Sequence, residues 1–309
     1  MKTQDRAVSY ILSNPAANVS DIMTAIPCGK SVAYAALSAV ERVKEHKPNH
    51  CKRVMICGDY HCGHKAGLTP PEWFVNPFQS KLGAKQEEAW GFYSDTIKTL
   101  PKPDILIVNG DSIDGKGKRS GGTELITSDR QEQGDMAVRC IQEVGAKKTY
   151  MTYGTPYHTG QGEDHENTIA EKVGAECIKD QLWLDVNGLV FDVKHAVGGS
   201  SVPYGRATAV AKEKTWNREW FETDEQPKAD IFIRHHVHFH RHTGDTSFLA
   251  MTGPALQAPD TKFGGRKCSG RVDFGFLYFT IKEGDTLSTI DWKAYIKPLE
   301  TFKAKLMVA

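Results

Sequence analysis

The chain has 309 residues and a formal net charge of +1 at pH 7, and its composition, 39% hydrophobic and 25% charged, is typical of a soluble globular protein. The length suits one large domain, or a catalytic domain with a small appendage. No stretch approaches the roughly 18 apolar residues of a membrane span, and the N-terminus lacks the apolar core of a signal peptide. We therefore expect a cytoplasmic protein without a membrane segment. A net charge near zero does not decide whether nucleic acid is a partner.

Residues 1–47 predict three short helices in a helix-turn-helix-like arrangement. The third helix, near residues 31–45, has its apolar residues on one side. One interpretation is that this helix reads DNA, with Lys30, Ser31 and Tyr34 near its exposed end. The other is that the segment caps the catalytic domain, or pairs with a second copy of the chain to make a homo-oligomer. Six basic and four acidic residues leave the segment a charge of only +2, and this modest balance favours the cap.

Residues 52–309 are expected to form a second, catalytic domain in which strands alternate with helices. The strands are expected near residues 52–56, 104–108, 149–153, 188–193 and 230–233. The helices are expected near residues 86–100, 130–145, 166–174 and 207–221. Three later strands, near residues 246–251, 274–281 and 289–296, have no helices between them, so we expect them to pair antiparallel. This order predicts an α/β domain with mixed sheets.

Metal-ligating side chains follow the ends of five successive predicted strands. In chain order they are Asp59 and His61, then Asp111, then Thr155 or His158, then His195, and finally His236 and His238. Strand ends at one edge of an α/β sheet are where binding sites assemble, and histidine with carboxylate suits zinc, manganese or iron. The sequence therefore predicts a metal site at this edge.

Cysteine usage offers one alternative metal site. The seven cysteines are an odd number without a regular spacing, which suits a reducing compartment better than a disulfide framework. Cys57 and Cys62 could form a zinc cluster with His61 and His64. No second cysteine pair stands at the spacing of a zinc finger, which argues against that cluster.

The order of the strand-end motifs resembles the calcineurin-like metallophosphoesterases. The matching stretches are Asp59-Tyr-His61, Gly110-Asp-Ser-Ile-Asp114, Gly154-Thr-Pro-Tyr-His158, His195 and His235-His-Val-His238, and the resemblance covers about residues 52–296. It implies a four-layer α/β/β/α sandwich with a two-metal site. It further implies that Asp59, His61 and His238 hold the first metal. The second would be held by His195 and His236, and Asp111 would bridge the two.

Two positions depart from the family pattern. The glycine expected before the final histidine pair is His235. The family's metal-binding asparagine and catalytic histidine are adjacent, whereas this chain has Thr155 and, three residues on, His158. A neutral hydroxyl is a poor metal ligand, so we expect the second metal to bind more weakly or through water. His158 is the candidate for the catalytic histidine, and the alternative is a loop histidine bonded to the backbone.

The resemblance implies hydrolysis of phosphoester bonds by a hydroxide that two metal ions activate. His158 would protonate the departing oxygen, and Asp114 would orient a ligand histidine. Manganese is the expected cofactor because the ligands are nitrogen and oxygen without thiolate, with zinc, iron or magnesium as alternatives.

Two basic, glycine-rich stretches, residues 116–122 and 262–271, are candidates for substrate binding, through Lys116, Lys118, Arg119 and Arg266. Such loops can follow a phosphate backbone or can simply be solvated. They favour a phosphodiesterase or nuclease acting on DNA, RNA or nucleotides, similar to the repair nucleases and phage-type enzymes of the family. The alternatives are a phosphomonoesterase of proteins or small molecules, and a DNA-binding or scaffold protein whose metal site is degenerate.

Overall fold

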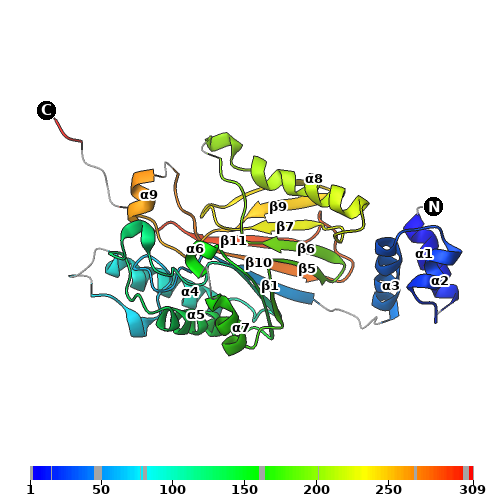
Figure 1. The fold of residues 1–309 in the computed structure, drawn as a ribbon, viewed down its shortest axis with the longest axis horizontal. Helices are drawn as coiled ribbons and strands as arrows, with labels where there is room; N and C mark the ends of the chain where they lie inside the picture. Colours follow the sequence, from blue (N-terminus) through cyan, green and yellow to red (C-terminus); the bar gives the residue numbers. More distant parts are fainter. Residues whose placement is uncertain are drawn as a thin grey trace.

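Two β-sheets lie face to face at the centre of the molecule, and helices cover their outer faces (Figure 1). The structure is a computed structural model that describes residues 3–14, 16–44, 51–76, 78, 82–159, 164–200, 202–267, 270–301 and 306–308. All the metal-ligating residues predicted from the sequence lie within these ranges.

Sheet one contains β1 (Cys51–Cys57), β2 (Ile105–Asn109), β3 (Lys148–Thr152), β4 (Cys177–Lys179), β10 (Phe274–Lys282) and β11 (Asp291–Lys297). Their order across the sheet is β11-β10-β1-β2-β3-β4. The first four strands of the chain run parallel, whereas β10 pairs antiparallel with β1 and with β11.

Sheet two contains β5 (Gln181–Val186), β6 (Leu189–Lys194), β7 (Ile231–Arg234), β8 (Arg241–Asp245) and β9 (Phe248–Thr252), in the order β5-β6-β7-β9-β8. The middle strands β6, β7 and β9 are parallel, and the edge strands β5 and β8 are antiparallel to their neighbours.

The sheets pack against each other through alternate residues of their strands, because successive side chains of a strand point to opposite faces. Val54 and Ile56 of β1 lie in the layer between the sheets, whereas Met55 and Cys57 face the helices outside. Burial of an aliphatic or aromatic side chain contributes roughly 1.5 to 3 kcal/mol. The layer between the sheets also includes Ile107, Phe191, Val193, Ile231, Ile233, Met251, Leu277 and Phe279.

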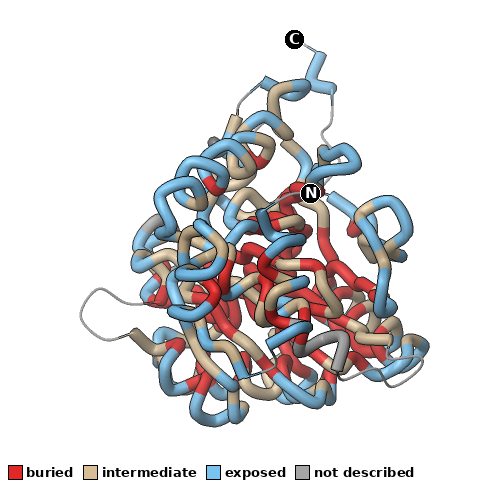
Figure 2. Tube along the Cα trace, turned by 90° about the vertical axis from the view of Figure 1, so that its right-hand side faces the viewer, coloured by how far each residue is buried: buried red, intermediate tan, exposed pale blue. Residues whose placement is uncertain are grey.

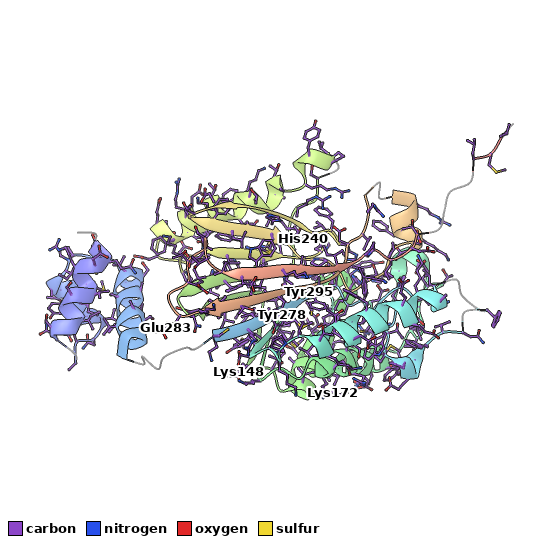
Figure 3. All side chains as sticks on the ribbon, turned by 180° about the vertical axis from the view of Figure 1, so that it is seen from behind. Lys148, Lys172, His240, Tyr278, Glu283 and Tyr295 are labelled. Atoms are coloured by element: carbon purple, nitrogen blue, oxygen red, sulfur yellow. The ribbon has the colours of Figure 1, made fainter. Side chains whose placement is uncertain are left out.

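The outer layers are helical. α4 (Gly83–Thr99), α5 (Arg130–Val144) and α7 (His165–Val173) cover sheet one, and α8 (Thr208–Glu222) covers sheet two (Figure 1). Tyr278 and Tyr295, labelled in Figure 3, belong to the side of sheet one that these helices cover. Figure 2 shows the buried segments running through the middle of the molecule. The order helix, sheet, sheet, helix confirms the predicted four-layer α/β/β/α architecture.

Short helical segments make the remaining connections. They are η1 (Pro71–Trp73), η2 (Lys118–Ser120), α6 (Pro156–Thr159), η3 (Pro203–Gly205) and α9 (Lys262–Lys267). Across the described residues, the helices are all too short or too polar to cross a lipid bilayer.

The expected antiparallel pairing of the last three predicted strands is only partly right. β10 and β11 do pair antiparallel, but β9 lies in the other sheet, parallel to β7. The reason is β8, an exposed polar strand without apolar alternation, which returns along the edge of sheet two and places β9 between itself and β7. β5 was also unexpected, although Asn187 and Gly188, both with positive φ, form the two-residue turn that joins it to β6.

The N-terminal helices α1 (Thr3–Ser13), α2 (Val19–Ala25) and α3 (Lys30–Lys44) share a hydrophobic cluster of their own. Its buried members are Ala7, Ile11, Ile22, Ala33, Ala36 and Val40. The apolar side of α3 therefore packs within the segment, whereas the cap interpretation required it to pack on the catalytic domain or on another copy. Residues 45–50, which would join the two predicted domains, lie outside the described residues. DNA reading and oligomerisation through these helices stay predictions.

A buried ionic cluster joins α8 to sheet two. The side chain of Arg234 on β7 is 1% exposed, and its Nη1 lies 3.1 Å from Asp192 Oδ1 on β6. Its Nη2 lies 2.6 Å from Glu213 Oε2 on α8. Because two carboxylates converge on one buried guanidinium, removing the cation would leave Asp192 buried without a counter-charge.

We expect Arg234→Met to lower the free energy of unfolding by about 3 to 5 kcal/mol, measured by urea denaturation, because the buried Asp192 carboxylate loses its cation. Arg218→Met is the matched control: Arg218 pairs with Glu222 on the exposed side of α8, and its loss should cost about 1 kcal/mol or less. Equal losses in the two variants would contradict the role assigned to this cluster.

Candidate metal centre

The predicted metal ligands converge at one end of the two sheets, where β1, β2, β6 and β7 reach their C-terminal ends. Three groups form there, and within each the potential ligand atoms all lie within 4.8 Å of one another. One consists of His61, Asp114 and His158, and the other two contain the predicted metal ligands. Asp59, His61 and His238 make the Asp59 group, and Asp111, His195 and His236 make the Asp111 group. Loops from both sheets therefore contribute to one site, as is usual at the carboxyl ends of parallel strands.

In the Asp59 group, three side chains point at a common position. Asp59 Oδ1 lies 3.3 Å from His238 Nε2 and 3.9 Å from His61 Nε2. The two imidazole Nε2 atoms are 3.2 Å apart. Three donor atoms at this spacing suit one divalent cation between them.

The Asp111 group adjoins the first through its carboxylate. Asp111 Oδ2 lies 3.1 Å from His195 Nε2 in its own group and 3.9 Å from His61 Nε2 in the other. His195 Nε2 is also 3.7 Å from Asp59 Oδ1. Asp111 thus faces ligands of both groups, which is the position expected of a bridging carboxylate.

Hydrogen bonds at the far side of two rings set their tautomers. His195 Nδ1 lies 2.8 Å from the carbonyl oxygen of Asn109, which can only accept, so Nδ1 carries a proton. His61 Nδ1 lies 3.1 Å from Asp114 Oδ1. With Nδ1 protonated, each neutral ring presents a lone pair at Nε2 to the carboxylates of the site. That arrangement is repulsive unless a proton or a metal ion lies between them.

The pKa shifts of the site residues likewise indicate that a positive charge belongs between the carboxylates. Burial by itself would lower the pKa of His195, but the carboxylates of Asp111 and Asp59 raise it to about 10. Burial would raise the pKa of Asp59, but His238 and His195 hold it well below its ordinary value. The pKa of Asp111 is lowered as well: burial opposes this shift, and His195 drives it. Both carboxylates are therefore ionised at neutral pH.

Two buried atoms test whether these residues fit a metal. Asp59 Oδ1 and His195 Nε2 have no hydrogen bond of good geometry within the described part of the chain, although His238 Nε2 and Asp111 Oδ2 lie 3.3 Å and 3.1 Å away. Buried polar atoms are normally satisfied. Contacts of this length and poor hydrogen-bond geometry, between nitrogen and oxygen atoms that can ligate a metal, fit a bound divalent cation. In the described residues the potential metal groups contain no cysteine.

The backbone of the site is held in an uncommon conformation. Asp59, His61, Asp111, His236 and His238 have positive φ angles of 51°, 46°, 50°, 72° and 54°. Positive φ costs most side chains free energy, but aspartate and histidine tolerate the left-handed region better than most residues. Strain of this kind persists where surrounding structure imposes it, and it clusters at functional sites.

Thr155, the weakest of the predicted ligands, lies beside the Asp111 group. Its backbone N–H donates to Asp111 Oδ1 at 2.6 Å, and its hydroxyl donates to Asp111 Oδ2 at 3.1 Å. The same hydroxyl is 3.3 Å from His236 Nδ1. Thr155 therefore positions the carboxylate of Asp111 directly.

His158 and Asp114 lie together on the other side, next to His61. His158 Nδ1 is 2.9 Å from the backbone oxygen of Asp114 and 3.5 Å from its carboxylate. The rings of His158 and His61 meet edge to face, with centroids 4.5 Å apart. The Asp114 carboxylate thus contacts the Nδ1 side of the His61 ring, away from the metal ligands. The Asp114 backbone oxygen holds His158 at the edge of the site, where 18% of the His158 side chain is exposed.

His235, the departure from the family glycine, is accommodated by glycines elsewhere. Its ring is completely buried, and its Nδ1 accepts from Asn109 Nδ2 at 2.8 Å. A Cβ at Gly58 would lie 2.6 Å from the ring, and one at Gly253 would lie 2.2 Å from it. The His235 imidazole therefore fits because Gly58 and Gly253, which lie against it, have no side chains.

Sequence reasoning missed Asn109 and Glu166, which hold the ligand loops in place. Glu166 on α7 accepts from the backbone N–H of Ser112 at 2.9 Å and of Gly154 at 2.6 Å. It thereby fastens the loop after β2 to the loop after β3. Burial raises the pKa of Glu166 to about 7. Its place at the start of a helix gave no sign of this role.

The predicted substrate-binding residues lie outside both groups. Lys116, Lys118 and Arg266 are exposed, and the side chain of Arg119 lies outside the described residues. Their loops are adjacent, because α9 contacts η2. The backbone N–H of Lys262 also donates to the Glu124 carboxylate at 2.9 Å.

Glu166 should make stability depend on pH. Its folded-state pKa of about 7 exceeds the ordinary value, so the stability that its protonated form contributes is lost as pH rises from about 4.3 through 7. Glu166→Gln cannot ionise. We therefore expect the unfolding free energy of the metal-free wild type, minus that of the variant, to decline between about pH 5 and pH 8. Urea denaturation measures both, with Glu87→Gln, an exposed glutamate, as control. A difference that is constant with pH would contradict this account.

No protein-family model and no curated protein sequence matches the chain. Among solved structures it is similar to vacuolar protein sorting 29 from Cryptosporidium parvum, with 11% identity, a TM-score of 0.43, and coverage of 80% of this chain and 99% of that one. It is also similar to a novel archaeal phosphodiesterase, with 9% identity, a TM-score of 0.41, and coverage of 79% and 99%. Vps29 from Entamoeba histolytica complexed with zinc gives 13% identity, a TM-score of 0.39, and coverage of 79% and 98%.

Proposed function

We propose that this protein is a metal-dependent phosphoesterase of the calcineurin-like metallophosphoesterase family, and that it hydrolyses phosphodiester bonds in nucleic acid or nucleotides. The observation that carries the proposal is the pair of adjoining ligand groups, with the carboxylate of Asp111 facing His195 in one and His61 in the other. Buried carboxylates and imidazole lone pairs that face one another require cations. A site that had lost its metals would have no reason to retain them, which argues against the degenerate scaffold alternative.

The two groups would each hold one divalent ion, and manganese is the proposed cofactor. When bound, such ions would supply Lewis-acid polarisation of a phosphoryl group and would lower the pKa of a water molecule toward neutral pH. Asp111 keeps the groups together, and Thr155 fixes the orientation of its carboxylate through two hydrogen bonds. Asp114 holds His61 with its Nε2 directed at the site.

His158 is the proposed general acid. The backbone oxygen of Asp114 accepts a hydrogen bond from His158 Nδ1–H, which leaves Nε2 to carry a second proton toward the substrate. The side chain lies at the rim of the Asp59 group and is partly exposed, so a leaving-group oxygen can approach it. Proton transfer from a positioned imidazolium contributes about 10²- to 10⁴-fold to rate.

The basic loops support a polyanionic substrate. Lys116 and Lys118 lie two and four residues after Asp114 and are exposed, and α9, which carries the exposed Arg266, contacts η2. Cations gathered beside a hydrolytic centre attract a phosphate backbone. A phosphomonoesterase needs no such extended rim, so the diester is favoured. Parallel assays with bis-p-nitrophenyl phosphate, p-nitrophenyl phosphate and single- and double-stranded DNA test this preference.

Asp111→Asn should lose far more than the roughly 10²-fold expected of a residue outside the metal ligands, because the bridging charge is removed. Hydrolysis of bis-p-nitrophenyl phosphate with added manganese measures the loss, and the manganese-induced rise in Tm, which does not depend on turnover, should shrink with it. Asp95→Asn, a carboxylate on the exposed side of α4, should leave both unchanged. Full activity of Asp111→Asn, or of the wild type in the presence of a strong chelator, would contradict the two-metal proposal.

His158→Ala should slow a substrate with a poor leaving group by about 10²- to 10⁴-fold. It should slow release of p-nitrophenolate much less, because that group departs without protonation. The comparison is between an alkyl and a p-nitrophenyl ester of the same phosphate, with His242→Ala, an exposed histidine, as control. Equal losses on both esters would point to metal or phosphate binding instead.

A further inference from the structure

A guanidinium that has no counter-ion among the described residues lies beside the loop that carries His238. Arg206 follows η3, in the segment between His195 and α8, and its Cζ lies 4.6 Å from the centroid of the Phe239 ring. Phe239 is buried and follows His238 directly. The other side of the guanidinium lies against Gly270, where a Cβ would come within 1.7 Å of Arg206 Nη2. An aromatic face and a glycine thus fix the position of this cation.

The charge of Arg206 is not neutralised by any carboxylate in the described part of the chain. Within the described ranges, no carboxylate lies within 4.0 Å of its guanidinium, and its Nε is buried without a hydrogen-bond partner. The nearby carboxylate of Asp273 is engaged elsewhere, since it accepts from the backbone N–H of His240 at 2.8 Å and lies 3.7 Å from Arg241 Nη1. A partly buried charge without a partner is costly. By contrast, the buried guanidinium of Arg234 has two carboxylates.

The segments around Arg206 are tied to the metal centre but do not enter it. The backbone N–H of Asp273 donates to the carbonyl of His238 at 2.9 Å, which fastens the chain after Gly270 to the ligand loop. Gly199, in the segment that leads to Arg206, lies beside Val237. An anion bound at Arg206 would therefore lie next to the loop that carries His238. It would be a different anion from one bound at the metal centre, between the Asp59 and Asp111 groups.

Guanidinium is suited to a phosphate in this position. Its planar fork donates two parallel hydrogen bonds to phosphate oxygens, and stacking on an aromatic ring fixes the plane of the fork in advance. We infer that Arg206 forms an anion subsite for a second phosphate of the substrate, the one that neighbours the hydrolysed phosphodiester along a nucleotide chain. This inference rests on the proposed function and names the substrate class more closely: a chain with at least two phosphates.

The test uses the full chain with manganese and two dinucleotides that differ only in a terminal 5′-phosphate. The measured quantity is the ratio of kcat/KM for the phosphorylated dinucleotide to that for the unphosphorylated one. Hydrogen bonds to charged groups contribute about 1.5 to 3 kcal/mol, so Arg206→Gln should lower this ratio about ten- to hundredfold, mainly through KM. Arg206→Lys keeps the charge without the fork and should fall between. Arg218→Gln, an exposed arginine of α8, should keep the wild-type ratio.

The outcomes separate this inference from the proposed function. An unchanged ratio in Arg206→Gln overturns the subsite, and so does a fall in kcat that is equal for both dinucleotides, which would indicate a structural role. If wild-type protein hydrolyses neither dinucleotide with any divalent metal, the proposed function fails. Calorimetric binding of the phosphorylated dinucleotide to metal-free protein then decides the subsite: weaker binding by Arg206→Gln supports it, and equal binding overturns it. Thermal unfolding of Arg206→Gln, compared with that of Arg206→Lys and wild type, detects a folding defect in the variant.

Discussion

The carboxylate of Asp111 contacts side chains from more loops of the site than any of the other carboxylates does. It lies against Thr155 after β3, His195 after β6 and His61 after β1, so its position couples three strand ends from two sheets. The fit is close on the backbone side as well, because a Cβ at Gly154 would lie 2.1 Å from the Asp111 amide nitrogen. Glu166 then fastens the neighbouring loops to each other. The ligand geometry therefore depends on one acid that is held from every side.

The site combines two costs that the rest of the fold must offset. Several ligands adopt left-handed backbone conformations, and like charges and lone pairs are buried close together. The interior layer between the sheets supplies the stability, since Val54, Ile56 and their partners are buried almost completely a few residues before the ligands begin. A strained, charged edge on a tightly packed sandwich is consistent with a site whose residues are retained for chemistry and not for stability.

The α/β class and the meeting of the ligands could be predicted from local order, an apolar strand followed by a polar ligand and repeated, whereas the four-layer arrangement was implied by the resemblance of the motifs to the calcineurin-like metallophosphoesterases. What could not be predicted depends on distant contacts. Glu166 is an ordinary helix residue until the fold places it against Ser112 and Gly154. β8 lacks apolar alternation, and its place at the sheet edge decided the pairing of β9. Arg206 is distinguished by its buried Nε, which has no hydrogen-bond partner among the described residues, and no sequence pattern reveals this.

The pairing of β1 with β10 affects how the chain can fold while it is being synthesised. Cys51 stands opposite Lys282, so the strand that leads into Asp59 is completed by a segment from near the other end of the chain. A growing chain releases His236 and His238 from the ribosome before β10 emerges, and until then β1 has an open edge on one side. Open strand edges invite pairing with other chains, and distant pairings form slowly. Nascent chains of this protein are therefore exposed to aggregation through this edge of β1 from the emergence of β1 until the emergence of β10.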